Sequence, residues 1–209
     1  MNLFFRLFLL AAIVASCTDG TNKPASVAAQ PSPVIKATPP TNLVSSPTSP
    51  DVSPLDVIYF PTDFPVQKMS QNGAALPVAR VIYSRPLKQG RTIFGSLIPY
   101  NDTWRLGANE STEIEFFKPV TIQKKRVAAG RYILYCVPEA TQWTLIFNTN
   151  IYSWGLKQDP SMDAHRFTIP TRKTEGVLEY FTMAFGKTPY GVDLTMSWDT
   201  VSASLPITL

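Results

Sequence analysis

The chain has 209 residues and a formal net charge of only +4. This modest charge, without an extended run of Lys and Arg, argues against nucleic acid as a partner. A single histidine excludes a multi-histidine metal site. The sequence also holds no P-loop, no G-x-G-x-x-G and no G-x-S-x-G motif, so we predict no cofactor.

The N-terminal residues 1–16 have the pattern of an export signal. Arg6 precedes an apolar run at 7–14, which is shorter than the about 20 residues needed to cross a bilayer. The sequence VASC at 14–17 resembles the lipobox of bacterial lipoproteins. This resemblance implies cleavage before Cys17 and fatty acyl chains, such as palmitate, on a lipoprotein of the bacterial cell envelope. The alternative is an ordinary secretory signal with an incidental cysteine.

Residues 17–54 are rich in Pro, Ser, Thr and Ala, with few charges and almost no large apolar side chains. Such a segment buries too little surface to offset chain entropy, so we predict a disordered, extended tether between a membrane and a folded domain. Residues 55–77 are transitional, and their apolar side chains can dock on the domain that follows. These side chains are Ile58, Tyr59, Phe60 and Phe64.

Residues 78–209 are predicted to form one domain, in which apolar and polar residues alternate as in half-buried strands. No segment of it keeps a 3.6-residue apolar period over three turns, and residues 66–75 can form a short helix at most. Short strands separated by Gly, Pro and Asn favour an all-β fold, either an antiparallel β-sandwich or a barrel-like domain. The clearest alternation is at Phe181, Met183 and Phe185, at Val192, Leu194, Met196 and Trp198, and at Val201, Ala203, Leu205 and Ile207.

Three residue types that often carry chemistry have structural interpretations in this domain. Cys136 lies in a strand-like run and is predicted to be a small buried hydrophobe, without a disulfide partner if Cys17 is acylated. His165 is predicted to be an ordinary strand residue. Glu113 and Glu115 share one strand face, about 6.6 Å apart by strand geometry, and are predicted to be solvated rather than a glycosidase pair.

Polar and aromatic side chains concentrate in the loop-rich stretch 85–110. Arginine forks suit planar carboxylates or phosphates, and tryptophan offers a flat face for a sugar ring or a cation. The stretch is either a ligand site or a structural clasp of Arg–carboxylate pairs and Asn-to-backbone bonds. Asn109 favours the clasp, whereas Trp104 and Arg105 favour the site. The candidate ligand-binding residues are Arg85, Arg91, Asp102, Trp104, Arg105, Asn109, Glu110 and, further along the chain, Trp154.

The same stretch carries a family resemblance. SRPLKQGRTIFGSLIPYNDTWRLGANESTEIEF, at 84–116, resembles the signature of the bacterial domain-of-unknown-function 2911 family, and AGRY at 129–132 and WG at 154–155 match as well. Two positions depart from the common pattern, with Asn101 in place of glycine and Leu106 in place of threonine. The resemblance implies a secreted or lipid-anchored envelope protein of β-rich fold. It implies no activity, because none is established for the family.

Three functions are compatible with these residues. The leading hypothesis is a non-catalytic envelope lipoprotein whose β-domain binds a small molecule, a glycan or an envelope protein through the 85–110 loops. The second is a hydrolase with Asp102 or Glu110 as general base and Arg105 stabilising negative charge. The third is a structural assembly subunit. A concave, solvent-accessible cleft that gathers Arg91, Arg105 and the two carboxylates would favour the first two hypotheses.

Overall fold

The structure, a computed structural model, describes residues 52–70 and 76–209. The predicted export signal, the predicted lipidation site at Cys17 and the predicted tether up to residue 51 lie outside the described residues. Within the part of the chain that is described, no helix has the length and apolarity to cross a membrane.

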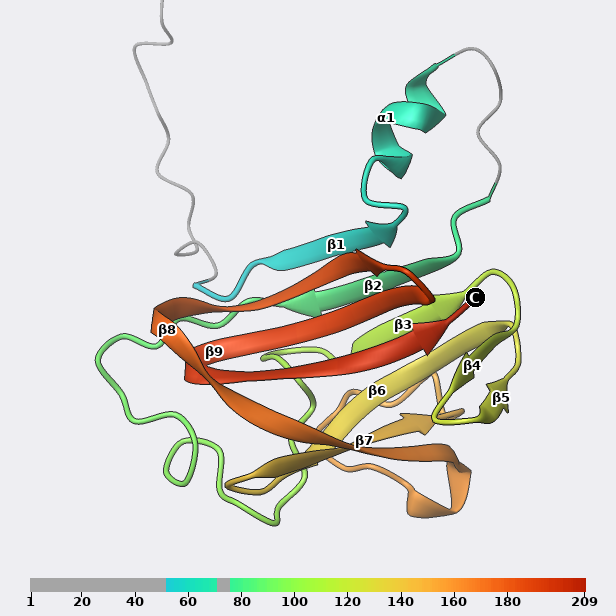
Figure 1. Ribbon diagram of the computed structural model, residues 1–209. Helices are drawn as coiled ribbons and strands as arrows, with labels where there is room; N and C mark the ends of the chain where they lie inside the picture. Colours follow the sequence, from blue (N-terminus) through green and yellow to red (C-terminus); the bar gives the residue numbers. More distant parts are fainter. Residues whose placement is uncertain (1–51, 71–75) are drawn as a thin grey trace, which may run out of the picture. The chain divides into compact units, whose positions relative to one another are not determined.

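Nine strands account for most of the described chain, and all neighbouring strands run antiparallel (Figure 1). They form one sheet in the order β1-β2-β3-β6-β7-β8-β9-β4-β5. The predicted all-β, antiparallel fold is therefore confirmed. The strands are β1 (Leu55–Phe60), β2 (Ala79–Ser84), β3 (Thr112–Phe116), β4 (Val120–Ile122), β5 (Lys125–Val127), β6 (Gly130–Pro138), β7 (Gln142–Asn148), β8 (Asp163–Thr188) and β9 (Gly191–Thr208). The helices are α1 (Phe64–Met69) and the short 3-10 helix η1 (Pro160–Met162).

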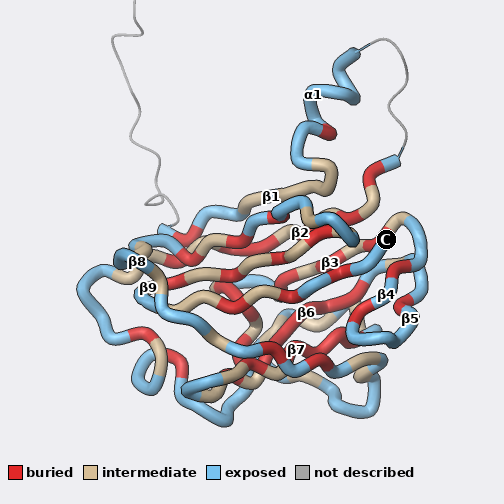
Figure 2. Tube along the Cα trace, viewed as in Figure 1, coloured by how far each residue is buried: buried red, intermediate tan, exposed pale blue. Residues whose placement is uncertain are grey.

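The alternation of apolar and polar side chains decides which face each strand buries. In β9 the apolar residues from Val192 to Trp198 are at most 1% exposed, and the residues between them are partly exposed. Figure 2 shows buried positions recurring along the strands, with exposed positions in the connecting loops. The core that results is rich in aromatic rings, among them Trp143, Phe147 and Phe181.

The two longest strands, β8 and β9, change direction along their length (Figure 1). The first part of β8 pairs with β7, and the remainder pairs with β9. β9 doubles back at Asp199, which has a positive φ of 54°, so that the hydroxyls of Thr195 and Ser204 lie 2.8 Å apart. The later part of β8 thereby comes to face β2, and the rings of Tyr83 and Phe181 meet edge to face at 5.7 Å. The core lies between these two parts of the sheet.

Hydrogen bonds join β8 to β2 and to the residues that follow β2. The N–H of Met183 donates to the Tyr83 hydroxyl at 2.9 Å, and burial raises the pKa of this hydroxyl. The N–H of Phe181 donates to the carbonyl of Pro86 at 3.0 Å. These bonds fix the point at which the 86–98 loop leaves the sheet.

The first strand of the sheet, β1, precedes Val78, the residue at which the predicted domain starts. β1 pairs with β2 from Leu55 opposite Ser84 to Phe60 opposite Ala79. The transitional residues therefore supply an edge strand of the sheet. Apolar side chains of this strand pack against β8, where the rings of Phe60 and Phe185 lie 6.2 Å apart. The short helix predicted at 66–75 is α1, and residues 71–75 lie outside the described residues.

Cys136 and His165 occupy the positions that the sequence predicts. Cys136 is fully buried in β6, and burial raises the pKa of its thiol. His165 lies in β8 and is half-buried, with its ring stacked on that of Phe167 at 5.8 Å. Burial lowers the pKa of His165, and the nearby charge of Lys125 lowers it further.

Glu113 and Glu115 lie on one face of β3, as predicted, and each pairs with an arginine of a neighbouring strand. Glu113 forms an ion pair with Arg131 of β6 at 2.6 Å, and Glu115 forms one with Arg80 of β2 at 2.5 Å. Cross-strand pairs of this kind hold partly exposed carboxylates on the sheet surface, away from the candidate site.

Candidate functional site

The candidate site lies in the long connection between β2 and β3, which returns to the sheet at Trp104. The backbone N–H of Trp104 donates to the carbonyl of Cys136, and the N–H of Cys136 donates back, both at 2.8 Å. The Trp104 indole consequently enters the core, where 7% of the residue stays exposed. It lies 4.9 Å from the ring of Phe181 and stacks on Trp198 at 6.1 Å. Trp104 is therefore chiefly a core residue, with only part of its ring available to a ligand.

The chain turns sharply after Trp104. Leu106 has a φ of 54° and is fully buried, and its carbonyl accepts a hydrogen bond from the Thr112 hydroxyl at 2.6 Å. The Gly107 carbonyl accepts from Trp104 Nε1 at 3.2 Å. A Cβ at position 107 would stand 3.0 Å from the carbonyl oxygen of Ser84, so glycine permits this close backbone approach. The turn brings the residues on both sides of Gly107 to one cavity.

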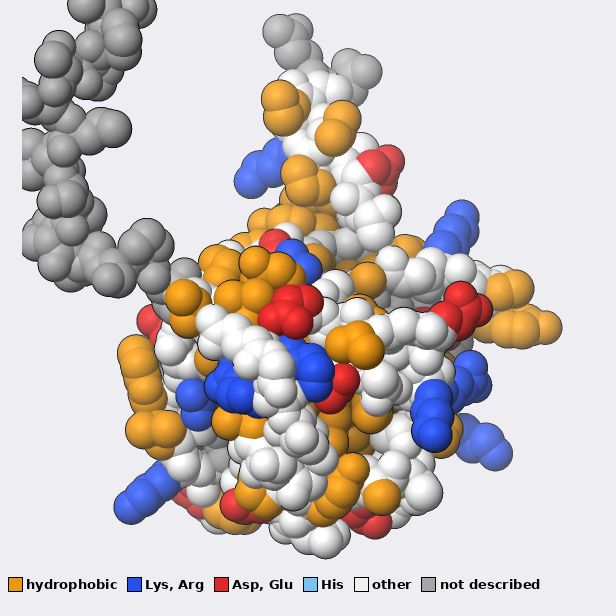
Figure 3. All heavy atoms as spheres, turned by 90° about the vertical axis from the view of Figure 1, so that its left-hand side faces the viewer, with side chains coloured by type: hydrophobic (Ala, Val, Ile, Leu, Met, Phe, Trp, Pro, Cys, Tyr) orange, Lys and Arg blue, Asp and Glu red, His pale blue; other side chains and the backbone are white. Residues whose placement is uncertain are grey.

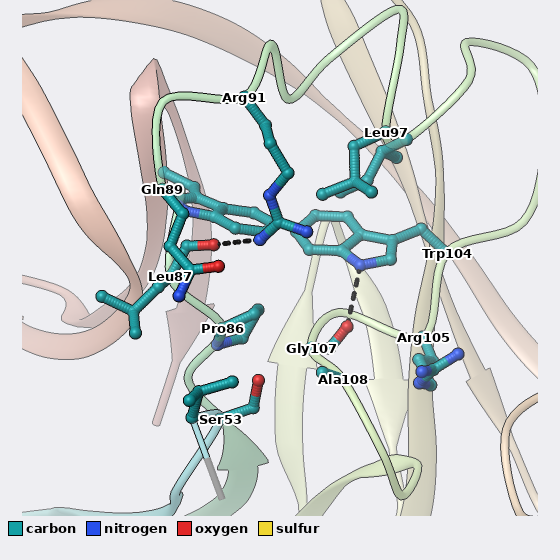
Figure 4. A pocket seen from close by; sticks show the side chains of 13 residues that line it. Ser53, Pro86, Leu87, Gln89, Arg91, Leu97, Trp104, Arg105, Gly107 and Ala108 are labelled. Atoms are coloured by element: carbon teal, nitrogen blue, oxygen red, sulfur yellow. Dashed lines mark hydrogen bonds between the residues drawn. The ribbon is translucent and has the colours of Figure 1, made fainter.

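This cavity has a volume of about 300 Å³ and lies between the turn at Gly107 and the 86–98 loop (Figure 4). In Figure 4, Arg91 and Leu97 reach it from one side, and Pro86, at the start of the same loop, and Gly107 lie on the opposite side. Among the described residues, its lining contains two arginines, Arg91 and Arg105, and no Asp, Glu, His or Cys. Nor do any three His, Cys, Asp or Glu side chains of the described chain gather into a group that could hold a metal ion.

Arg105 is half-buried in the lining of the cavity and has no hydrogen-bond or ion-pair partner among the described residues. Its Nε is buried without a hydrogen bond, and its guanidinium forms no ion pair within residues 52–70 and 76–209. Asp102 and Glu110, the carboxylates of the predicted clasp, are exposed and do not line the cavity. A buried guanidinium N–H without an acceptor is energetically costly, so this arrangement fits a site that an anion completes.

Arg91 is held in place by the backbone. Its Nε donates to the carbonyl of Lys88 at 2.9 Å, and its Nη2 donates to the carbonyl of Leu87. Figure 4 shows the guanidinium pointing into the cavity. The loop itself is fixed by Lys88, whose ammonium donates to the Arg91 carbonyl at 2.6 Å and to Asp199 Oδ2 at 2.8 Å. Arg91 is thereby preorganised as a donor.

Arg85 has a structural role instead. Its guanidinium pairs with Asp56 of β1 at 3.2 Å and donates to the hydroxyl of Thr182 at 3.1 Å and to the carbonyl of Phe181 at 3.3 Å. It also lies 5.7 Å from the ring centroid of Tyr180. Figure 3, which looks onto the side where β8 bends, shows basic side chains beside acidic ones. Arg85 therefore joins β1, β2 and β8, and it does not line the 300 Å³ cavity.

The other predicted residues lie outside the cavity lining. Asp102 is exposed and accepts a hydrogen bond from the N–H of Thr103 at 2.7 Å. Asn109 is exposed with a φ of 58°, and Glu110 beside it is exposed. Trp154 is 59% exposed on a different loop. The structure thus brings together Arg91, Trp104 and Arg105, and it leaves the two carboxylates of the hydrolase hypothesis apart from them.

Sequence reasoning missed most of the apolar lining. Leu87, Leu97 and Trp198 line the cavity. Trp198 belongs to an alternating strand, where its pattern indicates only a core residue. Leu87 and Leu97 stand in an irregular loop, where no periodicity assigns a side chain to a face. The sequence signal that could have pointed to them is their position on either side of Arg91.

The loop 149–162 approaches Arg105 from the other side and is anchored at its end by Asp163. The Tyr135 hydroxyl and Asn148 Nδ2 donate to Asp163 Oδ1 at 2.7 and 2.8 Å, and Arg166 pairs with Oδ2 at 2.7 Å. Burial and the bond to Asp163 both raise the pKa of Tyr135. This network joins the end of the loop to β6, β7 and β8.

These features define an antiparallel β-domain with a small cationic cavity built by its loops. The family model described as protein of unknown function (DUF2911) matches residues 65–207, and the chain belongs to this family. The match spans the whole candidate site except for Val52 and Ser53 at the edge of the cavity. No curated protein matches the chain, and no solved structure matches it.

Proposed function

We propose that this protein is a non-catalytic binding protein that takes a small ligand combining an anionic group with a flat, apolar body. The observation that carries the proposal is Arg105, a half-buried arginine whose Nε has no hydrogen bond, in a cavity whose described lining holds no carboxylate. A guanidinium stays charged at all physiological pH values and offers donors in a planar fork. An anion paired with the guanidinium would compensate its positive charge, for which no ion-pair partner exists among the described residues.

The apolar side chains that line the cavity support the proposal that the ligand has a flat, apolar body. Leu97, Trp104 and Trp198 present hydrocarbon and indole surfaces to the same space as the arginines. Ligand sites commonly combine such surfaces with a few fixed polar groups, and a cavity of about 300 Å³ is at the small end of their range. Because the described part of the lining contains no acid, base or thiol nucleophile, the residues present favour binding over catalysis.

The proposal includes a place in the cell. The VASC sequence before the tether supports a bacterial envelope lipoprotein, anchored through Cys17, with the binding domain held away from the membrane. If so, wild-type protein should partition with membranes, and Cys17→Ala should be soluble or unprocessed. Mass spectrometry that finds a soluble wild-type chain with an unmodified N-terminus would defeat this part of the proposal.

Binding is tested with phenyl phosphate and benzoate as probes and with tryptophan indole N–H resonances as the readout. The chain has four tryptophans, of which Trp104 and Trp198 line the cavity and Trp154 does not. We expect both probes to shift the resonances of Trp104 and Trp198 and to leave that of Trp154 in place.

The Arg105→Gln variant should weaken phenyl phosphate binding by about tenfold or more, the effect of one lost charged hydrogen bond. Arg126→Gln changes an exposed arginine of β5 and is the matched control, expected to bind as wild type does. Neutral benzyl alcohol should bind equally to the wild type and the Arg105→Gln variant. The proposal fails if neither anionic probe binds, or if Arg105→Gln binds them as tightly as Arg126→Gln does.

A further inference from the structure

A second cavity, of about 190 Å³, lies beside the first and shares part of its wall. Both cavities are lined by Leu97, Ile98, Trp104 and Arg105. Beyond this common wall the second cavity is formed by Thr103 and other residues of two loops, 97–105 and 155–156. Arg105 therefore stands at the boundary between two spaces rather than at the end of one.

The outer wall of the second cavity is fixed in place. The Ser111 hydroxyl donates to the carbonyl of Ser153 at 2.9 Å, which ties the loop 149–162 to the residue before β3. Gly155 has a φ of +95°, and a Cβ there would stand 2.6 Å from Ser111 Oγ and 3.1 Å from Arg105 Cδ. Only a glycine allows the loop to approach this closely, so the wall lies in direct contact with the Arg105 stem.

The charges of the two cavities have the same sign. Within residues 52–70 and 76–209, neither lining contains Asp or Glu, and Arg105 is the cationic residue that both share. An anion paired with Arg105 can therefore extend into either space without meeting a like charge. A carboxylate or a phosphate monoester carries one substituent and fills one cavity only. A phosphodiester carries a group on each side and keeps two free oxygens for the guanidinium fork.

We propose that the ligand of this protein is a phosphodiester whose phosphate pairs with Arg105 and whose two ester groups occupy the two cavities. This inference rests on the proposed function and names the chemical class of its ligand. The larger ester group lies in the 300 Å³ cavity, against Trp198 and near Arg91. The smaller one lies in the 190 Å³ cavity, between Thr103 and Leu156.

The test compares diphenyl phosphate with phenyl phosphate on the full chain carrying Cys17→Ala, which removes the lipid anchor. Burying a second phenyl group contributes on the order of 1.5–3 kcal/mol, so the diester should bind about tenfold tighter or more. Leu156→Trp and Thr103→Phe each narrow the second cavity from an exposed position and should reduce this ratio to about one. Trp154 is two residues before Leu156 and does not line the second cavity, so Trp154→Ala should preserve the ratio of the two affinities.

Two outcomes would overturn the inference while the proposed function stands. One is equal affinity of the wild type for the two probes, with binding of both lost in Arg105→Gln. The other is a diester preference that persists in both Leu156→Trp and Thr103→Phe. If neither probe binds, the proposed function fails together with the inference.

Two further probes distinguish a soluble diester from a lipid headgroup as the ligand. Glycerophosphoglycerol is a soluble diester, and vesicles of phosphatidylglycerol present the same group at a lipid surface. Sedimentation with the vesicles that is lost in Arg105→Gln would assign a lipid headgroup. Shifts of the Trp104 and Trp198 resonances with the soluble probe alone would assign a free diester. A response to neither probe would overturn the inference.

Discussion

Gly155 lies against the side chain of Arg105, so closely that a Cβ at position 155 would stand 3.1 Å from Arg105 Cδ. The same Cβ would stand 2.6 Å from the hydroxyl of Ser111, and the φ of +95° is one that residues with side chains rarely adopt. The contact joins two loops that are 50 residues apart in number. The contact lies beside a side chain that lines both cavities.

We expect Gly155→Ala to lower the free energy of unfolding by about 1–3 kcal/mol, because the new side chain is strained and crowded. It should also weaken phenyl phosphate binding by displacing Arg105. Urea unfolding and the tryptophan resonances measure the two effects. Gly176→Ala is the matched control, because a Cβ there meets open space; its unfolding free energy should stay within about 0.5 kcal/mol of wild type. Equal losses in the two variants would contradict the prediction.

Arg85 and Arg105 should respond differently to truncation. Arg85→Ala removes two hydrogen bonds and a partly exposed, hydrogen-bonded ion pair with Asp56, and we expect a loss of about 1–3 kcal/mol of stability. Arg105→Gln removes no hydrogen bond or ion pair with the described residues and should change stability by less than about 0.5 kcal/mol. Denaturant unfolding measures both variants. A loss above about 2 kcal/mol for Arg105→Gln would show that its guanidinium is part of a structural clasp.

His165 should make the protein less stable as the pH falls. Its folded pKa lies below the usual value of about 6.5, because burial and the charge of Lys125 disfavour the protonated ring. As the pH falls, His165 therefore takes up its proton at a higher pH in the unfolded state than in the folded state. The stability contributed by neutral His165 is complete above about pH 6.5 and is lost as the pH falls below it. His165→Gln should remove this part of the pH dependence of unfolding.

The pKa of His165 can be read directly by NMR titration, because the chain has one histidine. Lys125→Gln should raise this pKa by removing the neighbouring charge, whereas Lys124→Gln is the control one residue earlier. A wild-type pKa at or above that of an exposed histidine would refute the prediction.

Cys136 should be inert to thiol reagents in the folded protein. It is fully buried in β6, and burial raises the pKa of its thiol, so little reactive thiolate forms. In a Cys17→Ala chain, Ellman's reagent at pH 8 should label less than one tenth of the protein until denaturant is added, on the order expected of a protected thiol. Rapid stoichiometric labelling under native conditions would show that β6 opens or that Cys136 is accessible.

The edge strand β1 should contribute to stability. A fragment starting at Val52 retains β1, its pairing with β2 and the ion pair of Arg85 with Asp56, whereas a fragment starting at Val78 lacks them. We expect the longer fragment to unfold at a higher urea concentration, and both to give β-dominated circular dichroism spectra. Identical midpoints would show that β1 adds no net stability.

The sequence by itself determined the fold class of the described chain and the fate of several side chains. Alternation with a period of two is a local property, so the strands around Phe181, Val192 and Leu205 could be recognised without knowing their partners. The same locality allowed the burial of Cys136 and the strand position of His165 to be predicted. The family followed from the motif at 84–116, which is also a contiguous stretch of sequence.

Only the tertiary structure decided which of the candidate residues meet. The sequence does not distinguish the roles of Arg85, Arg91 and Arg105. In the structure Arg85 joins three strands, Arg91 is held by its own loop, and Arg105 has no partner among the described residues. Their roles depend on groups far away in the chain, such as Thr182 for Arg85 and Gly155 for Arg105. Irregular loops have no periodicity that assigns a side chain to a face, and long-range packing alone fixes what each guanidinium contacts.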